Sequence, residues 1–281
     1  MPDDLHPPMA AVREAVARSL AEDVLPLGDL TASLVPEDVH ARAAFVVRED
    51  GVLAGRLCAG EAFTQVDPTV VVAWSADADD GERVEKGTVV GVVTGPLRSI
   101  LTAERTALNL LCHLSGIATV TRRYADLAAP ARIRDTRKTT PGLRALEKAA
   151  VRAGGGVNHR ANLSDGILVK DNHLGGLSIT EAVQRATARW PGRVVEVECD
   201  SVEQLHEALD AGAGMVLLDN MPPEQVRRCV GLVGGRIPVE VSGGITLATV
   251  ADYGAAGADF VSVGALTHSS PILDIGLDLE G

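Results

Sequence analysis

From about residue 131 onward, short apolar runs alternate with amphipathic segments, and this alternation constrains the fold more than any other feature of the chain. It predicts parallel strands joined by crossover helices. We expect six strands, at residues 132–135, 166–170, 194–199, 215–219, 238–242 and 259–264. We expect helices between them, at residues 143–153, 179–190, 202–211, 223–233 and 247–256. An α/β fold follows, with an incomplete six-stranded βα barrel, about two units short of the usual eight.

The ends of the predicted strands share a chemical character. Almost every strand ends in a polar residue or a glycine: Asp135, Lys170, Glu198, Asp219, Ser242 and Gly264. In βα barrels the C-terminal strand ends form the active-site face. A single strand-end aspartate is often only a helix cap, so the prediction of a functional face depends on all six positions together.

The region before the barrel has a different pattern. Residues 8–22 have helical periodicity, and glycines punctuate short β-like runs at 43–47, 70–74 and 88–93. Residues 103–128 are expected to form one long helix or a kinked pair, with Thr102 able to cap its first turn. The predicted organisation is an N-terminal α+β domain (1–113), a barrel domain (114–266) and a C-terminal segment (267–281) that returns to the N-terminal domain.

Composition excludes several classes of function. The chain has 26 basic and 38 acidic residues and a net charge of -12, which argues against a nucleic-acid partner. No apolar run reaches the roughly 20 residues that a membrane helix needs, and the N-terminus has no signal-peptide pattern. Four scattered cysteines have no metal-site spacing, so we expect reduced thiols and a cytoplasmic protein.

Positive charge is concentrated in one part of this acidic chain. Five basic side chains fall at turns or just after short apolar stretches: Arg137, Lys138, His159, Arg160 and Lys170. Such placement allows them to converge on one small volume. We therefore expect a compact polyanion to bind there.

Two further patterns refine this expectation. The last two strands end in glycine, within Ser-Gly-Gly at 242–244 and at Gly264, which is typical of a phosphate site. Glu198 and Asp219, on neighbouring strand ends, suggest Mg²⁺ held largely through water. The same carboxylates could instead form ion pairs with Lys138 or Lys170. A rival hypothesis makes Lys170 the Schiff-base lysine of a lyase.

Several motifs together resemble one family, the quinolinate phosphoribosyltransferases. The most specific is Asp-Thr-Arg-Lys-Thr-Thr-Pro-Gly at 135–142. Matching text also occurs at 104–119, 154–160, 168–173, 195–198, 217–220 and 241–245, so the resemblance covers essentially the whole chain. It implies an N-terminal sandwich domain, a barrel catalytic domain and the transfer of a phosphoribosyl group to quinolinate with loss of CO2.

The resemblance also implies residue roles. Quinolinate binding falls on Arg105, Arg137, His159, Arg160 and Lys170. The catalytic residues would be Lys138, Glu198 and Asp219, which also hold the ribose and Mg²⁺-pyrophosphate of phosphoribosyl pyrophosphate. The 5′-phosphate falls on Ser242, Gly243, Gly244, Gly264 and His268.

The resemblance further implies a homodimer, or a hexamer of dimers, in which Arg105 reaches the active site of the neighbouring subunit. Two other functions stay open at this point. A related phosphoribosyltransferase for another small ring carboxylate would keep the phosphate site but need fewer cations. A non-catalytic carrier would use residues 80–91, whose sequence resembles the hairpin of biotinyl and lipoyl domains without their Met-Lys-Met tip.

Overall fold

The computed structural model describes residues 5–280, which divide into two compact units. The first contains residues up to 122, residues 139–155 and residues from 266 onward. The second contains residues 123–138 and 156–265. Each unit has its own main sheet, so the antiparallel and parallel parts of the fold are described separately.

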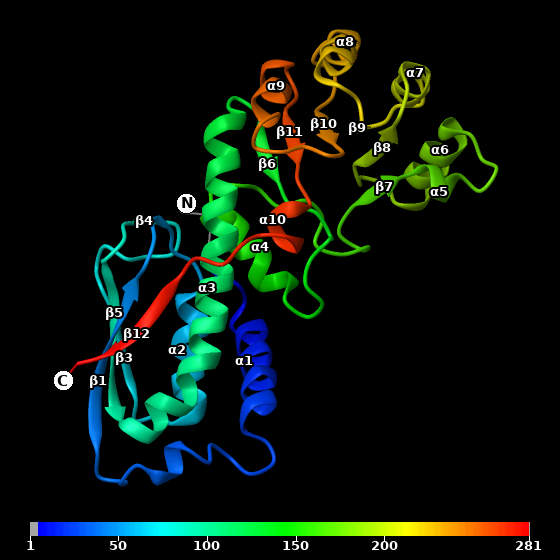
Figure 1. Ribbon diagram of the computed structural model, residues 1–281. Coiled ribbons are helices and arrows are strands. Elements are labelled where there is room, and N and C mark those ends of the chain that lie inside the picture. Colours follow the sequence, from blue (N-terminus) through cyan, green and yellow to red (C-terminus); the bar gives the residue numbers. More distant parts are fainter. Residues whose placement is uncertain (1–4, 281) are drawn as a thin grey trace. The chain divides into compact units, whose positions relative to one another are not determined.

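The first unit contains a four-stranded antiparallel sheet in the order β12-β1-β5-β3. Its strands are β1 (His40–Val47), β3 (Val71–Trp74), β5 (Val89–Pro96) and β12 (Ile275–Leu279). Figure 1 shows the last strand, β12, beside the first, β1. The carboxyl end of the chain thus completes an edge of this sheet.

Helices α1 (Met9–Val24) and α2 (Arg56–Val66) belong to the same unit. Phe63 of α2 meets Phe45 of β1 edge to face, with ring centroids 6.1 Å apart, and Phe45 stacks on Trp74. These aromatic contacts join α2 to the sheet. A chain with only 2 % aromatic residues thus gathers three of them at one place.

Residues 80–91 do not form the hairpin that their sequence resembles, so that interpretation is wrong. Strand β4 (Arg83–Val84) pairs with β2 (Gly51–Val52), whereas β5 pairs with β1 and β3. The two halves of the segment therefore lie in different sheets and do not pair with each other. A likeness of local sequence did not extend to the pairing that defines a carrier hairpin.

One continuous helix, α3 (Leu97–Ala128), spans the region where one long helix or a kinked pair was expected. The helix begins five residues before Thr102, so the predicted cap is wrong. The Thr102 hydroxyl instead donates to the carbonyl of Arg98 at 2.9 Å, inside the helix. Gly116 allows a close approach: a Cβ there would lie 2.0 Å from the carbonyl oxygen of Pro271.

The second unit contains the predicted parallel sheet of six strands. Their bounds are β6 (Arg132–Arg134), β7 (Ile167–Val169), β8 (Val195–Cys199), β9 (Met215–Asp219), β10 (Val239–Ser242) and β11 (Phe260–Ser262). The order is β6-β11-β10-β9-β8-β7, so the first strand pairs with the last, and β6 and β7 are the two edges. The barrel is incomplete at this one place, between β6 and β7.

The connecting helices follow from local sequence signals. They are α5 (Asp171–Leu174), α6 (Ile179–Arg189), α7 (Val202–Asp210), α8 (Pro223–Val233), α9 (Val250–Ala255) and α10 (Ala265–His268). Helix α6 begins with a capping box between Ser178 and Glu181, and the Ser201 hydroxyl caps α7. Helix α4 (Arg144–Ala153) lies in the first unit, although its sequence falls between two barrel strands.

The four cysteines are free and buried. Burial raises the pKa of the Cys58 and Cys199 thiols to about 12, so both stay protonated and unreactive near neutrality. Among the helices within residues 5–280, none combines the length and the apolar character that crossing a bilayer requires.

Replacing Gly116 by alanine tests the close approach to the 271–272 segment. We expect Gly116→Ala to lower the free energy of unfolding by about 1–3 kcal/mol, because the added methyl meets backbone atoms that cannot rotate away. Gly60→Ala in α2 is the matched control, since its Cβ would meet nothing within 4 Å. It should stabilise the protein by roughly 0.5–1 kcal/mol. Chemical denaturation measures both, and equal effects would contradict the packing account.

Candidate active site

The opening between β6 and β7 is occupied by the turn at residues 157–160. Val157 forms an isolated bridge to Arg134 of β6. The carboxylate of Asp135, which is fully buried, accepts from the backbone N–H of His159 at 2.8 Å and from the Asn158 amide at 2.6 Å. The predicted strand-end aspartate therefore secures this turn to the edge of the barrel.

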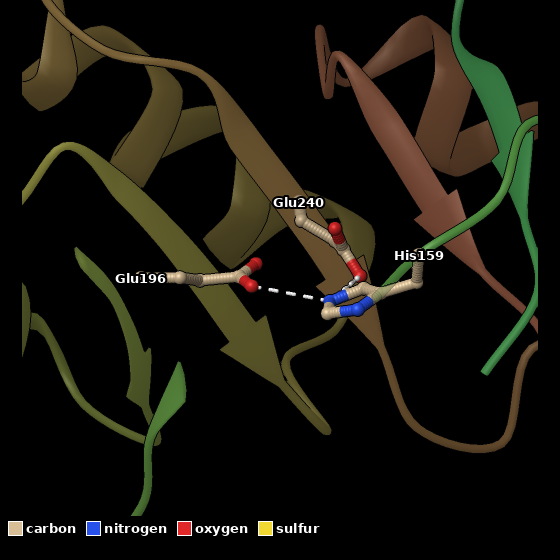
Figure 2. A group of neighbouring side chains, drawn as sticks. All are labelled: His159, Glu196 and Glu240. Carbon is tan, nitrogen blue, oxygen red and sulfur yellow. Dashed lines mark ion pairs between the residues drawn. The ribbon is translucent and has the colours of Figure 1, made fainter. Parts of the chain in front are cut away.

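The turn places the His159 ring beside two glutamates from the sheet (Figure 2). Its Nε2 lies 3.1 Å from Glu196 Oε2 and 3.5 Å from Glu240 Oε1. Its Nδ1 accepts from the backbone N–H of Arg160 at 2.7 Å. Because Nδ1 is the acceptor, the ring proton lies on Nε2, which can donate to the carboxylates.

Glu240 is fully buried on β10 and has two further partners. The Arg134 guanidinium and the Ser262 hydroxyl both donate to it in short contacts. Burial raises the pKa of the Glu240 carboxyl, and the nearby Glu196 carboxylate raises it further. The positive charge of Arg134, which also stacks on the Phe260 ring at 4.2 Å, acts in the opposite direction.

His159, Glu196 and Glu240 bring one ligand atom each within 4.8 Å of one another, which is close enough to hold a metal ion. The hydrogen-bond pattern does not fit one. A metal on Nε2 would move the ring proton to Nδ1, where the N–H of Arg160 already points. Arg134 also neutralises Glu240. The group is therefore a hydrogen-bonded ion cluster.

A second ion pair lies at the ends of β7 and β8. Lys170 and Glu198, which were expected in different halves of a substrate site, are joined by a short contact. A small recess adjoins them, with Val197, Asp200 and Gln204 among the residues of its wall. The alternative of an ion pair at Glu198 is thus realised here, and it does not preclude a role in binding.

The ends of β9 and β10 form a tight polar cluster. Ser242 donates to one oxygen of Asp219 in a short contact, and the Asn220 amide donates to the other at 2.6 Å. Gly243 has a φ of +100°, and a Cβ there would lie 2.2 Å from the Asn220 side-chain oxygen. The predicted Asp219 and Ser242 are therefore in contact, and Asn220 lies against both Asp219 and Gly243.

Asn220 was missed by sequence reasoning. It has a φ of 55°, a left-handed conformation that no other non-glycine residue within 5–280 adopts. Asparagine tolerates this conformation better than most residues, and such strain tends to occur at functional sites. Its place directly after a strand-end aspartate was the signal that could have found it.

Glu198 and Asp219 offer only oxygen donors on neighbouring strand ends. Hydrogen bonds fix the orientation of both carboxylates while leaving lone pairs free to accept from water. This donor set fits Mg²⁺, which prefers oxygen ligands and keeps several of its waters.

The charges of two guanidinium groups, those of Arg137 and Arg160, interact beside the 157–160 turn. Burial lowers the pKa of Arg160, and the positive charge of Arg137 lowers it further. The Arg160 side chain is held by a bond to the carbonyl of Gly166 at 3.0 Å. Arg137 and Lys138 are exposed, and the N–H of Lys138 donates to the Thr136 hydroxyl at 3.0 Å. Arginines gathered in this way suit an anion with more than one carboxylate.

The remaining predicted residues lie elsewhere in the chain. Gly264 follows β11, whereas Arg105 on α3 and His268 on α10 belong to the first unit. Arg105 is exposed and makes no hydrogen bond or ion pair with any residue of the described 5–280 range.

The end of the Asp-Thr-Arg-Lys-Thr-Thr-Pro-Gly motif is held separately, within the first unit. Glu147 of α4 is fully buried; one of its oxygens accepts from the N–H of Thr140 at 3.1 Å. Its other oxygen lies 2.9 Å from His113 Nε2 on α3. Sequence reasoning missed this pair because neither residue lies at a strand end.

Comparison with known proteins covers nearly all of the chain. The family model for the N-terminal domain of quinolinate phosphoribosyl transferase matches residues 29–115, and the model for the C-terminal domain matches residues 117–278. The chain is 44% identical over 276 residues to nicotinate-nucleotide pyrophosphorylase [carboxylating] of Mycobacterium leprae, covering 96% of this chain and 97% of that one. It is 43% identical over 256 residues to a probable enzyme of the same name from Bacillus subtilis, covering 90% and 88%.

The folds also agree. The solved nicotinate-nucleotide pyrophosphorylase of Francisella tularensis superposes with a TM-score of 0.92 at 38% identity, covering 97% of both chains.

The contact between Gly243 and Asn220 gives a test of the strand-end cluster. Gly243→Ala should lower the free energy of unfolding by about 2 kcal/mol more than Gly212→Ala, because only the former adds a clash to the strain of a positive φ. Gly212 has a similar φ of +83° and nothing within 4 Å of its Cβ. Denaturant titration of both variants measures the difference. Equal losses would show that Asn220 can move aside.

Proposed function

Because the chain belongs to the quinolinate phosphoribosyltransferase family, we propose that it transfers the phosphoribosyl group of phosphoribosyl pyrophosphate to quinolinate with decarboxylation. The products are nicotinate mononucleotide, pyrophosphate and CO2, in de novo NAD biosynthesis. The observation that carries this proposal is the partly buried Arg160, on which the positive charge of Arg137 acts; two such guanidinium groups match the paired carboxylates of quinolinate.

The cation cluster would hold quinolinate with its ring nitrogen toward C1 of the ribose. Arg137, Arg160 and Lys170 supply the positive charge, and His159 borders the site. Arg105 would come from a second copy of the chain. Its exposure without a hydrogen-bond or ion-pair partner in the described chain supports that role. Holding both reactants in line accounts for much of the rate enhancement.

The phosphoribosyl half would lie at the ends of β8 to β11. Ser242, Gly243, Gly244, Gly264 and His268 are proposed for the 5′-phosphate. Lys138 would stabilise the departing pyrophosphate, while Glu198 and Asp219 face the positive charge that develops on the ribose. Mg²⁺, when bound through water to the same two carboxylates, would neutralise pyrophosphate charge.

The bond changes follow from these positions. The ring nitrogen bonds to C1 as the C1–oxygen bond to pyrophosphate breaks. When the adjacent carboxylate leaves as CO2, its bonding electron pair stays on the ring carbon, where the neighbouring positively charged nitrogen stabilises it. A proton then takes the place of CO2 on the ring carbon. The protein positions and stabilises charge without forming a covalent bond.

The Schiff-base lyase has less support. Lys170 is paired with Glu198, and an amine held as an ammonium ion is not a nucleophile. A phosphoribosyltransferase for a ring with a single carboxylate would not need the cluster of cations. We also propose a cytoplasmic location, which the free, buried cysteines support.

A direct assay tests the activity. Purified protein mixed with Mg²⁺, phosphoribosyl pyrophosphate and quinolinate should release CO2 and form nicotinate mononucleotide, and chelation of the metal should suppress turnover. Absence of both products from a folded protein supplied with Mg²⁺ would refute the proposed function.

Substrate selectivity should depend on the second carboxylate. We expect nicotinate, which lacks the 2-carboxylate, to be at least ~100-fold worse than quinolinate in kcat/KM, because one charge-assisted contact is lost. That factor corresponds to about 2.7 kcal/mol. Steady-state kinetics with each acid decides the matter, and comparable turnover would show that the cation cluster serves another purpose.

Mixed dimers test the origin of Arg105. Arg105→Ala and Lys138→Ala should each be nearly inactive alone, because each removes one charge from both sites of a dimer. Refolded together, random pairing makes half of the dimers mixed, each with one intact site, so about a quarter of wild-type activity should return.

Native mass spectrometry of the same mixture provides the control by counting mixed dimers. If mixed dimers form and activity does not return, Arg105 acts within its own subunit or has no role.

A further inference from the structure

Glu196 on β8 is a buried carboxylate that is only half satisfied. Its side chain is 8% exposed, and Oε2 lies 3.1 Å from His159 Nε2. Oε1 is buried and has no hydrogen-bond partner within the described residues. Leaving a buried carboxylate oxygen without a partner is costly, so the contribution of Glu196 to stability does not explain its presence.

The contacts of Glu196 lead toward the cation cluster. His159 Nδ1 accepts a hydrogen bond from the backbone N–H of Arg160 at 2.7 Å. The orientation of the ring therefore constrains the backbone from which the Arg160 side chain extends. The negative charge of Glu196 also acts directly on Arg160, against the repulsion from Arg137. Glu196 thus influences Arg160 in two ways, through the ring and through space.

A second carboxylate fixes the other side of the same turn. Asp135 accepts from the N–H of His159, which leaves the ring free to rotate about its side-chain bonds. Glu196 and Glu240 meet the ring itself, from β8 and β10 (Figure 2). Of these two, Glu240 is already bonded to Arg134 and Ser262, whereas His159 is the hydrogen-bonding partner of Glu196.

We infer that Glu196 is a positioning residue for quinolinate: it orients His159 and thereby directs the Arg160 guanidinium into the dicarboxylate site. The inference rests on the proposed function only in taking quinolinate as the ligand. Glu196 touches neither substrate in this scheme. Its effect falls on the quinolinate half of the site, because its side chain contacts His159 and its charge acts on Arg160.

This role predicts opposite effects on stability and on binding. Glu196 and the buried Glu240 carboxylate repel each other, so an apolar side chain of similar volume at position 196 relieves that repulsion as it removes the hydrogen bond to His159. Glu196→Met should therefore keep or raise the midpoint of thermal unfolding. The same variant should weaken quinolinate binding by about 10- to 100-fold, the range expected when a group that orients a ligand-binding residue is lost.

The experiment measures quinolinate binding by calorimetry, thermal unfolding, and KM for both substrates in three variants. Glu196→Met should raise Kd and KM for quinolinate and leave KM for phosphoribosyl pyrophosphate within about 2-fold. Glu196→Gln keeps an acceptor for His159 and should retain quinolinate affinity within about 3-fold. Asp80→Asn is the matched control, a buried carboxylate near Arg56 and His6 in the other unit. It should lower thermal stability without changing quinolinate affinity.

Two results would overturn the inference. One is wild-type affinity for quinolinate in Glu196→Met. The other is an equal loss in Glu196→Met and Glu196→Gln, which would assign the effect to charge and not to the hydrogen bond. The wild-type titration separates this test from the proposed function: a wild-type protein that does not bind quinolinate refutes the function itself.

Discussion

The candidate site depends most on the hydrogen bonds that the Asp135 carboxylate accepts from the turn at 158–159. Strands β6 and β7 do not pair, so the parallel sheet alone does not enclose its interior. The turn occupies the opening, and it brings His159 and Arg160 with it. A buried carboxylate with both oxygens bonded is a rigid anchor. An anchor of this kind at the end of β6 converts a gap in the barrel into one wall of the candidate site.

The polar interior of the second unit follows from strand alternation. Residues at even positions of β8 and β10 bring Glu196, Glu198, Glu240 and Ser242 to one face, while the valines between them are buried on the other. Four groups at this face are acidic or hydroxylic; Arg134 and Lys170 balance the charges of Glu240 and Glu198, and the neutral ring of His159 lies against Glu196. The polar side chains reduce apolar packing on this face, whereas the valines on the opposite face keep it. Stability and function are thus assigned to opposite faces of the same strands.

Ion pairs connect parts of the site that sequence reasoning kept separate. Lys170, expected to bind quinolinate, is bonded to Glu198, expected to face the ribose. Either substrate would meet a lysine and a carboxylate that already neutralise each other. The preformed pair keeps both charges in place before substrates arrive, so less reorganisation is needed on binding.

The sequence by itself determined the six strands, their order along the chain and the polar character of their ends, because strand alternation and capping signals are local. Motif resemblance also identified the family and most of the residues that the structure brings together around β7 to β10. Tertiary structure decided what local patterns do not encode. The start of α3 at Leu97 and the separation of β4 from β5 depend on partners far away in sequence. The left-handed conformation of Asn220 and the unpartnered oxygen of Glu196 can be interpreted only from their neighbours on other strands. Periodicity records which face of a strand is buried, whereas the identity of the opposing side chain depends on how distant strands are placed.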